Sequence, residues 1–130
     1  MFTLNQIKEA HAQVKSGADF PKYIQDLSAL GILKYITYVQ DGHSELMGAN
    51  SYTLTSDARY VPLKIADESA PEAFKEYLTK HQQGQSDYPT FCKQAAETGT
   101  DKWITDIAQM TCTYYDKAGN EIVVETIPGV

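Results

Sequence analysis

Two stretches of the chain match each other at a constant offset of 68 residues, without a gap. Residues 19–39 read DFPKYIQDLSALGILKYITYV, and residues 87–107 read DYPTFCKQAAETGTDKWITDI. The identical pairs are Asp19/Asp87, Pro21/Pro89, Gly31/Gly99, Lys34/Lys102, Ile36/Ile104 and Thr37/Thr105. A repeat constrains the architecture more than a single motif does, because both copies are expected to form the same structural unit.

The matched positions fall where helices are expected to begin and end. The two aspartates stand at N-cap positions, and the two prolines follow in the first turn, where a missing N–H is harmless. The two glycines stand just past the helix ends, where a positive φ favours glycine. Outside this core the offset becomes 70, so that His11 matches His81 and Leu4 matches Phe74.

Hydrophobic periodicity and turn signals extend the match to an ααβββ unit that occurs twice. Helices are expected at residues 3–16, 20–30, 70–83 and 88–98. Strands are expected at 32–40, 44–48, 51–55, 102–107, 110–116 and 121–126, with a short extended segment at 60–65. Capping boxes are expected at Thr3/Gln6 and Ser69/Glu72.

These elements predict an α+β fold, built as a fused duplication of the ααβββ unit, with an antiparallel sheet and helices packed on one side. A chain of 130 residues is typical of one domain, so residues 1–130 are expected to form a single domain with halves of about 1–66 and 67–130. Each half is too short to bury an independent core, and the halves are therefore expected to pack together.

Composition excludes several classes of protein. The net charge of −6 and the lack of a basic run argue against nucleic-acid binding. No apolar stretch is long enough to span a membrane, and the first residues lack the features of a signal peptide. We therefore expect a cytoplasmic protein with no membrane partner, and no zinc or cofactor motif is present.

The turn at residues 41–45 is the first candidate for chemistry. Asp41, His43 and Glu45 bring acid and imidazole groups to one hairpin tip, beside the hydroxyl of Ser44. An oriented imidazole beside a hydroxyl is what nucleophilic catalysis requires, so these residues are candidate catalytic groups together with Arg59. The alternative is a polar hairpin turn without a catalytic role.

Other candidates have structural alternatives. Arg59 could clamp a carboxylate or phosphate, or it could pair with Asp57 to stabilise the connector. The matched His11 and His81 could form a symmetric pair that titrates or binds a metal, although helix packing explains both. Cys92 and Cys112 are expected to be buried thiols rather than a disulfide or reactive groups.

Aromatic side chains are frequent on the expected strands, and alternation should place some of them away from the helices. An exposed aromatic face can bind a partner or a flat ligand, and it can equally serve cross-strand packing. The strand aromatics are Tyr35, Tyr38, Tyr52, Trp103, Tyr114 and Tyr115.

Two stretches, SGADFPKYIQDL and VQDGHSELMGAN, resemble the YbcV-like family. This is a family of uncharacterised enterobacterial and prophage proteins, some of them labelled phage envelope proteins. The resemblance extends over the whole chain, and it implies no catalytic residues.

We predict a small non-catalytic binding or accessory protein of prophage origin, with its site in a groove or on a sheet face at the pseudo-twofold axis. The alternatives are a small enzyme with a polar site around Asp41, His43 and Glu45, and a structural phage component. The partner is expected to be a protein or small molecule, with a homodimer as a further alternative. His43 matches a threonine in the second copy, and such departures from the repeat are where a specialised site is expected.

Overall fold

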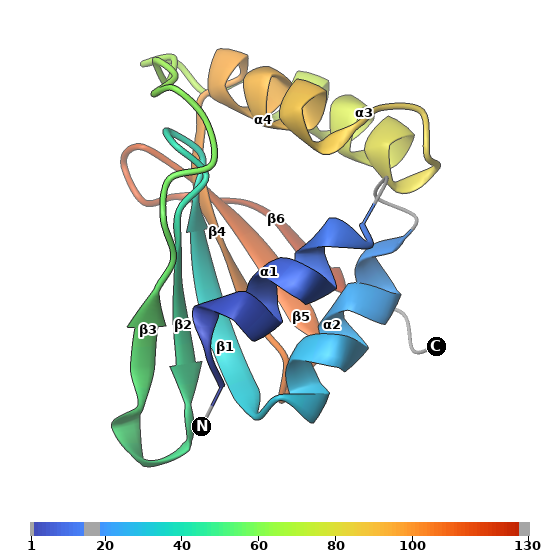
Figure 1. The fold of residues 1–130 in the computed structure, drawn as a ribbon. Helices are drawn as coiled ribbons and strands as arrows, with labels where there is room; N and C mark the ends of the chain where they lie inside the picture. Colours follow the sequence, from blue (N-terminus) through green and yellow to red (C-terminus); the bar gives the residue numbers. More distant parts are fainter. Residues whose placement is uncertain (1, 15–18, 128–130) are drawn as a thin grey trace.

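A computed structural model describes residues 2–14 and 19–127 of the chain. The element order within them is ααβββ followed by ααβββ (Figure 1). The first half contains α1 (Leu4–Ala12), α2 (Phe20–Ala29), β1 (Ile32–Tyr38), β2 (Ser44–Gly48), a 3-10 turn (η2, Ala49–Ser51) and β3 (Thr53–Thr55). The second half contains α3 (Pro71–Gln82), α4 (Tyr88–Glu97), β4 (Thr100–Asp106), β5 (Thr111–Asp116) and β6 (Glu121–Thr126).

The strands form one antiparallel sheet in the order β3-β2-β1-β4-β5-β6. The central pair is β1 and β4, in which Ile36 lies opposite Ile104. These two residues also match each other in the sequence, and the strand order is the same when read outward from either of them. The predicted α+β fold is confirmed, whereas the origin of the two halves by duplication stays a prediction.

All four described helices lie on one face of the sheet (Figure 1). Tyr35, Trp103 and Tyr114 point toward the helices and are buried. Tyr38 and Tyr115 fall on the other face by strand alternation and are half-buried. The predicted division of the strand aromatics between two faces is thus observed, and the larger share packs beneath the helices.

Tyr52 differs from the prediction, because it precedes β3 and packs into the core instead of lying on a strand. Its ring contacts Phe2 edge to face at 4.8 Å, and its hydroxyl donates to the Phe2 carbonyl at 2.9 Å. The next residue, Thr3, caps α1 in the predicted capping box with Gln6. The start of the chain is therefore fixed against the turn between β2 and β3.

Several local predictions are wrong. The first helix ends at Ala12 rather than at residue 16, and Gly17 lies outside the described residues. Asp87 caps α4 by accepting from the Thr90 N–H at 2.9 Å, whereas Asp19 makes no side-chain cap. The reason is conformational: Asp19 has helical φ and ψ, and an N-cap side chain normally needs an extended backbone.

The segment between the two halves also departs from the sequence prediction. The N-cap of α3 is Ala70, which has no side-chain cap, so the proposed capping box of Ser69 and Glu72 is absent. Residues 60–65 form no strand. Instead, the Tyr60 hydroxyl donates to the Val39 carbonyl at 2.5 Å, and the Leu63 N–H donates to the Gln40 carbonyl at 2.6 Å. These bonds hold the segment against the end of β1.

The matched glycines Gly31 and Gly99 give a direct test of local packing. Both have a positive φ, of 95° and 80°. A Cβ on Gly31 would have no neighbour within 4 Å, whereas one on Gly99 would lie 2.6 Å from the Glu68 carbonyl oxygen. Gly31→Ala should cost about 1 kcal/mol of unfolding free energy through backbone strain. Gly99→Ala should cost roughly 2 kcal/mol more, because backbone must move.

Urea denaturation of the two variants measures this difference. Gly119→Ala is the control, because Gly119 also has a positive φ, of 87°, and open space around its Cβ position. Equal losses for Gly31→Ala and Gly99→Ala would contradict the proposed contact with the segment before α3.

Candidate functional site

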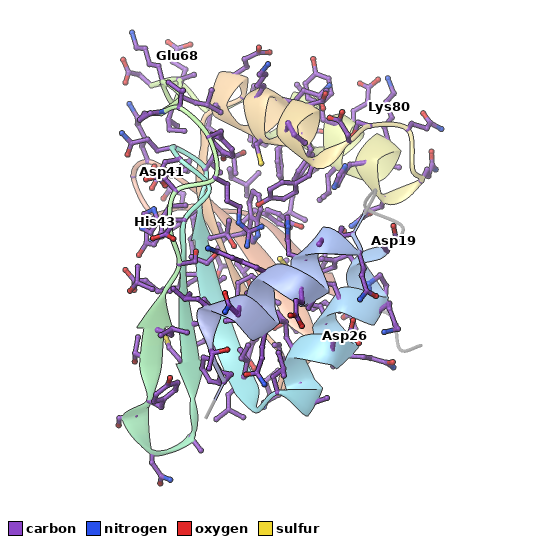
Figure 2. All side chains as sticks on the ribbon, in the orientation of Figure 1. Asp19, Asp26, Asp41, His43, Glu68 and Lys80 are labelled. Carbon is purple, nitrogen blue, oxygen red and sulfur yellow. The ribbon has the colours of Figure 1, made fainter. Side chains whose placement is uncertain are left out.

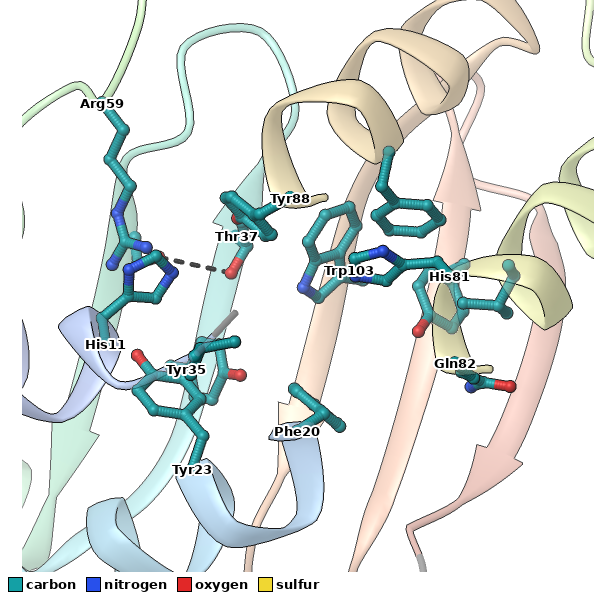
Figure 3. Close-up of a pocket in the computed structure, with 15 residues that line it drawn as sticks. His11, Phe20, Tyr23, Tyr35, Thr37, Arg59, His81, Gln82, Tyr88 and Trp103 are labelled. Carbon is teal, nitrogen blue, oxygen red and sulfur yellow. Dashed lines mark hydrogen bonds between the residues drawn. The ribbon is translucent and has the colours of Figure 1, made fainter. Parts of the chain in front are cut away.

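A groove runs between the two helix pairs and reaches the helix-covered face of the sheet (Figure 3). It encloses a cavity of about 60 Å³. A volume of this kind holds about four to six water molecules, since one needs roughly 10–15 Å³. The groove is therefore large enough to admit part of a small organic molecule.

Residues matched by the repeat face each other across this groove. Its floor includes Tyr35 of β1 and Trp103 of β4, which match at the offset of 68. The other matched pairs in the lining are His11/His81, Phe20/Tyr88 and Tyr23/Phe91. The groove thus lies where the two halves meet, which is one of the two places that the sequence analysis predicts for a site.

The second-half wall is a packed aromatic cluster. Trp103 lies 5.7 Å from both Phe91 and Tyr114, measured between ring centroids, and Phe74 supports the cluster from behind. His81 stacks on Phe91 at 4.4 Å with an interplanar angle of 7°. Tilted and stacked rings of this kind form a rigid apolar surface.

Arg59 reaches the groove from the connector between β3 and α3 (Figure 3). It is the only arginine in the chain, and the offset of 70 that applies outside the core matches it to Gly129, so it has no basic counterpart. Its guanidinium carbon lies 6.0 Å from the centroid of the Tyr88 ring, within cation–π range. Arg59 is half-buried, so its charge is partly removed from water.

No ion pair joins Arg59 to a carboxylate among residues 2–14 and 19–127. The alternative that Arg59 pairs with Asp57 is therefore wrong. Asp57 is exposed and lies 3.6 Å from the Lys8 amine instead. The guanidinium therefore faces the groove without a counter-ion from the described part of the chain.

The groups around Arg59 are neutral at pH 7. Burial, with a smaller contribution from the Arg59 charge, lowers the pKa of His11 to about 4. Burial raises the pKa of the neighbouring phenols and thiol, and the Arg59 charge opposes this only in part. These groups are Tyr23, Tyr35, Tyr60, Tyr88 and Cys92. Arg59 is thus the one charged side chain in the lining of this groove, whose other residues are neutral and largely aromatic.

Neutral hydrogen-bonding groups lie at the same end of the groove as Arg59 (Figure 3). The hydroxyls of Thr37 and Ser44 are 3.2 Å apart and buried. The His11 ring contacts Tyr23 and Tyr88 edge to face, at 5.5 and 5.2 Å. This end can therefore offer several donors to one polar group, whereas the Trp103 end offers mainly apolar contact.

The predicted cluster at the β1–β2 turn is partly assembled (Figure 2). Asp41 Oδ1 lies 2.5 Å from His43 Nδ1 and also accepts the His43 backbone N–H at 3.0 Å. Although burial raises it, the hydrogen bonds from His43 hold the pKa of Asp41 below its usual value. Tyr38 stacks on the His43 ring at 4.5 Å and donates to Glu45 at 3.3 Å.

Arg59 does not complete that cluster. Its backbone N–H donates to the Asp41 carbonyl at 2.7 Å, but its side chain lines the groove. Asp41, His43 and Glu45 are not among the residues that line the groove. The four candidate residues therefore divide into a surface pair with a linked glutamate and a separate groove arginine.

The matched histidines lie in different surroundings. His81 Nδ1 lies 3.1 Å from both the carbonyl and the hydroxyl oxygen of Ser86, whereas His11 faces Arg59.

Across the described residues, no group of three or more His, Cys, Asp or Glu side chains is arranged to hold a metal ion. Cys92 and Cys112 are buried free thiols, and burial raises the pKa of Cys112 to about 11.

The sequence predicts a groove between the two halves but not the residues that line it, because the lining comes from helices, strands and the connector. The sequence pattern that could have identified this lining is the combination of aromatic pairs matched between the halves with an arginine that has no match. The sequence leaves Trp103 open between ligand binding and packing and does not single out Tyr23 or Tyr88 as site residues. It places Arg59 with Asp41, His43 and Glu45, whereas the Arg59 side chain lines the groove.

Burial of the two matched histidines predicts acid sensitivity. The pKa of His11 falls from an ordinary value of 6.5 to about 4, and burial also lowers the pKa of His81. Between these values the unfolded chain binds protons that the folded chain does not, so stability should fall as pH falls from 6.5 toward 4. The phenols that contact His11, Tyr23 and Tyr88, have pKa values raised by burial and stay neutral in this range.

Urea denaturation at about pH 7.5 and about pH 5 measures this loss, with His11→Gln and His81→Gln compared to the parent chain. Each variant should lose less stability on acidification than the parent does, whatever its stability at neutral pH. An unchanged loss in both variants would contradict the proposed role of these histidines.

Comparison with known proteins identifies a family. Residues 8–126 match a family described as protein of unknown function (DUF1398). The chain is also 23% identical over 115 residues to the uncharacterized protein YcgX of Escherichia coli (strain K12), covering 88% of this chain and 86% of that protein. No described helix is long and apolar enough to cross a membrane. Since the match spans most of its length, the chain belongs to the DUF1398 family.

Proposed function

We propose that the protein binds a small organic molecule in the groove between its two helix pairs, without transforming it. The observation that carries this proposal is the half-buried Arg59 guanidinium, which faces an aromatic cavity and lacks a carboxylate partner among the described residues. Ligand sites are typically concave and apolar, with a few polar groups that fix orientation.

The arrangement of the lining also supports binding. A groove that served only to pack two halves would gain most from apolar contact, yet this one collects His11, Arg59 and two hydroxyls at one end. The two hydroxyls are hydrogen-bonded to each other, whereas the partly desolvated Arg59 charge has no carboxylate partner among the described residues. A ligand that supplies such a partner would recover the cost of desolvating Arg59.

A second candidate function is catalysis at the β1–β2 turn. The short contact between Asp41 and His43 Nδ1 favours it, because a carboxylate that accepts from one imidazole nitrogen leaves the other as a base. Faster hydrolysis of p-nitrophenyl acetate by the parent chain than by His43→Gln would support this candidate. Equal rates would leave binding as the better proposal.

Prophage origin, a cytoplasmic location and a structural role in a phage particle stay predictions that rest on the family resemblance and on composition. Detection of the protein in purified phage particles would favour the structural role. Its absence from them would favour an accessory protein.

Binding in the groove should perturb Trp103, the only tryptophan of the chain. We expect the single indole N–H resonance in a proton–nitrogen correlation spectrum to shift in a saturable way when benzoate or benzyl alcohol is added. The reason is that Trp103 forms part of the groove lining, where a bound ring would alter its magnetic environment.

Two variants make this test specific to the groove. Val14→Phe places a phenyl ring in the lining and should weaken binding. Val124→Phe adds the same ring on the opposite face of the sheet, where Val124 is 59% exposed, and should bind as the parent does. Failure of both probes to shift the Trp103 resonance would contradict binding in the groove.

A further inference from the structure

We infer that the ligand of this groove is a monoanion with a flat apolar body, such as an aromatic carboxylate, held by Arg59 at its charged end. This inference rests on the proposed binding function and adds the class of ligand. It can fail while binding in the groove stands, because a neutral molecule could occupy the same space.

The first step is the charge of the groove. Arg59 supplies a positive charge, and the titratable side chains that line the groove beside it are neutral at pH 7. An unpaired, partly desolvated cation is stabilised by an anion that can accept hydrogen bonds. A carboxylate suits the planar guanidinium best, since two parallel N–H donors can meet its two oxygens.

The second step is the number of charges. The groove offers one permanent cation, and the whole chain carries a net charge of −6. A monoanion would balance Arg59, whereas a dianionic phosphate would leave a negative charge among neutral phenols and aromatic rings. The carboxylate or sulfonate class is therefore favoured over a phosphate monoester.

The third step is the orientation of the ligand along the groove. Figure 3 shows Arg59 and His11 at one end of the groove, and Trp103 and His81 farther along it. His11 is neutral there and can donate one ring N–H without adding charge. The Trp103 end presents packed ring faces and edges, which suit a flat apolar group. The ligand should thus enter with its anionic group toward Arg59 and its apolar body toward Trp103.

The test compares three probes that share one phenyl ring: benzoate, benzyl alcohol and phenyl phosphate. Their dissociation constants are measured from the Trp103 indole resonance at about pH 7.5. Benzoate should bind about 10- to 100-fold more tightly than benzyl alcohol, the range expected for a hydrogen-bonded ion pair. Phenyl phosphate, a dianion at this pH, should bind more weakly than benzoate.

Three variants locate the preference. Arg59→Gln should abolish the preference for benzoate while benzyl alcohol binds as before. Arg59→Lys should retain only part of the preference, because lysine lacks the two parallel N–H donors of the guanidinium. Lys64→Gln is the matched control, since it removes one positive charge from an exposed site outside the groove lining and should change nothing. Unchanged benzyl alcohol binding also shows that the Arg59 variants remain folded.

Chemical modification tests the same point in the unaltered protein. Phenylglyoxal reacts with arginine, and Arg59 is the only one in the chain, so mass spectrometry reports a single site. Benzoate should slow the modification, and benzyl alcohol at equal occupancy should slow it less.

The outcomes are distinct. Equal affinity for benzoate and benzyl alcohol, or a preference that survives Arg59→Gln, overturns the ligand class but leaves groove binding intact. Tighter binding of phenyl phosphate overturns the monoanion. Failure of all three probes to move the Trp103 resonance overturns the proposed function itself.

Discussion

Antiparallel pairing between β1 and β4 joins the two halves of the chain into one sheet. Five residue pairs make this junction, and Ile36 opposite Ile104 is the middle one. A three-stranded sheet with two helices would leave its inner edge unpaired, with open backbone donors and acceptors. Joining the two edges satisfies those groups and brings the helix pairs side by side over one face. The groove is the space that this junction leaves between them, so its position follows from the strand pairing.

The connector between β3 and α3 adds the charged side chain of Arg59 to the groove that the β1–β4 pairing creates. It is anchored to the β1–β2 turn by the Arg59 N–H, which donates to the Asp41 carbonyl, and by the Tyr60 ring, which lies close to Gly42. A Cβ on Gly42 would lie 2.7 Å from that ring, so glycine at this turn permits the close approach. With its backbone held there, Arg59 extends its side chain into the groove. The backbone of this turn therefore supports Arg59, while the side chains of Asp41 and His43 form the second candidate site.

Local signals predicted the helices, strands and element order because each depends on neighbouring residues: Gly31 and Gly99 do have positive φ, and β2 has the predicted bounds. Predictions that needed tertiary geometry were less successful. The Ser69 box is absent because Ala70 occupies the N-cap. Pairing of Arg59 with Asp57 is expected from their separation of two residues, but the fold directs the Asp57 carboxylate to Lys8 instead. The groove brings residue 11 to residue 88 and residue 59 to residue 23, and no local pattern encodes those distances.

The asymmetry of the matched residues explains how two halves with the same element order can line one groove whose two ends differ. Equivalent positions carry Tyr35 and Trp103 on the floor, and His11 and His81 on the walls. If the surroundings were also equivalent, both ends of the groove would present the same chemistry and a ligand would have no preferred direction. Arg59 removes that equivalence, because the connector supplies a charge to the His11 end only. In the proposed binding function, the matched pairs provide most of the apolar surface and the unmatched Arg59 sets the orientation of the ligand.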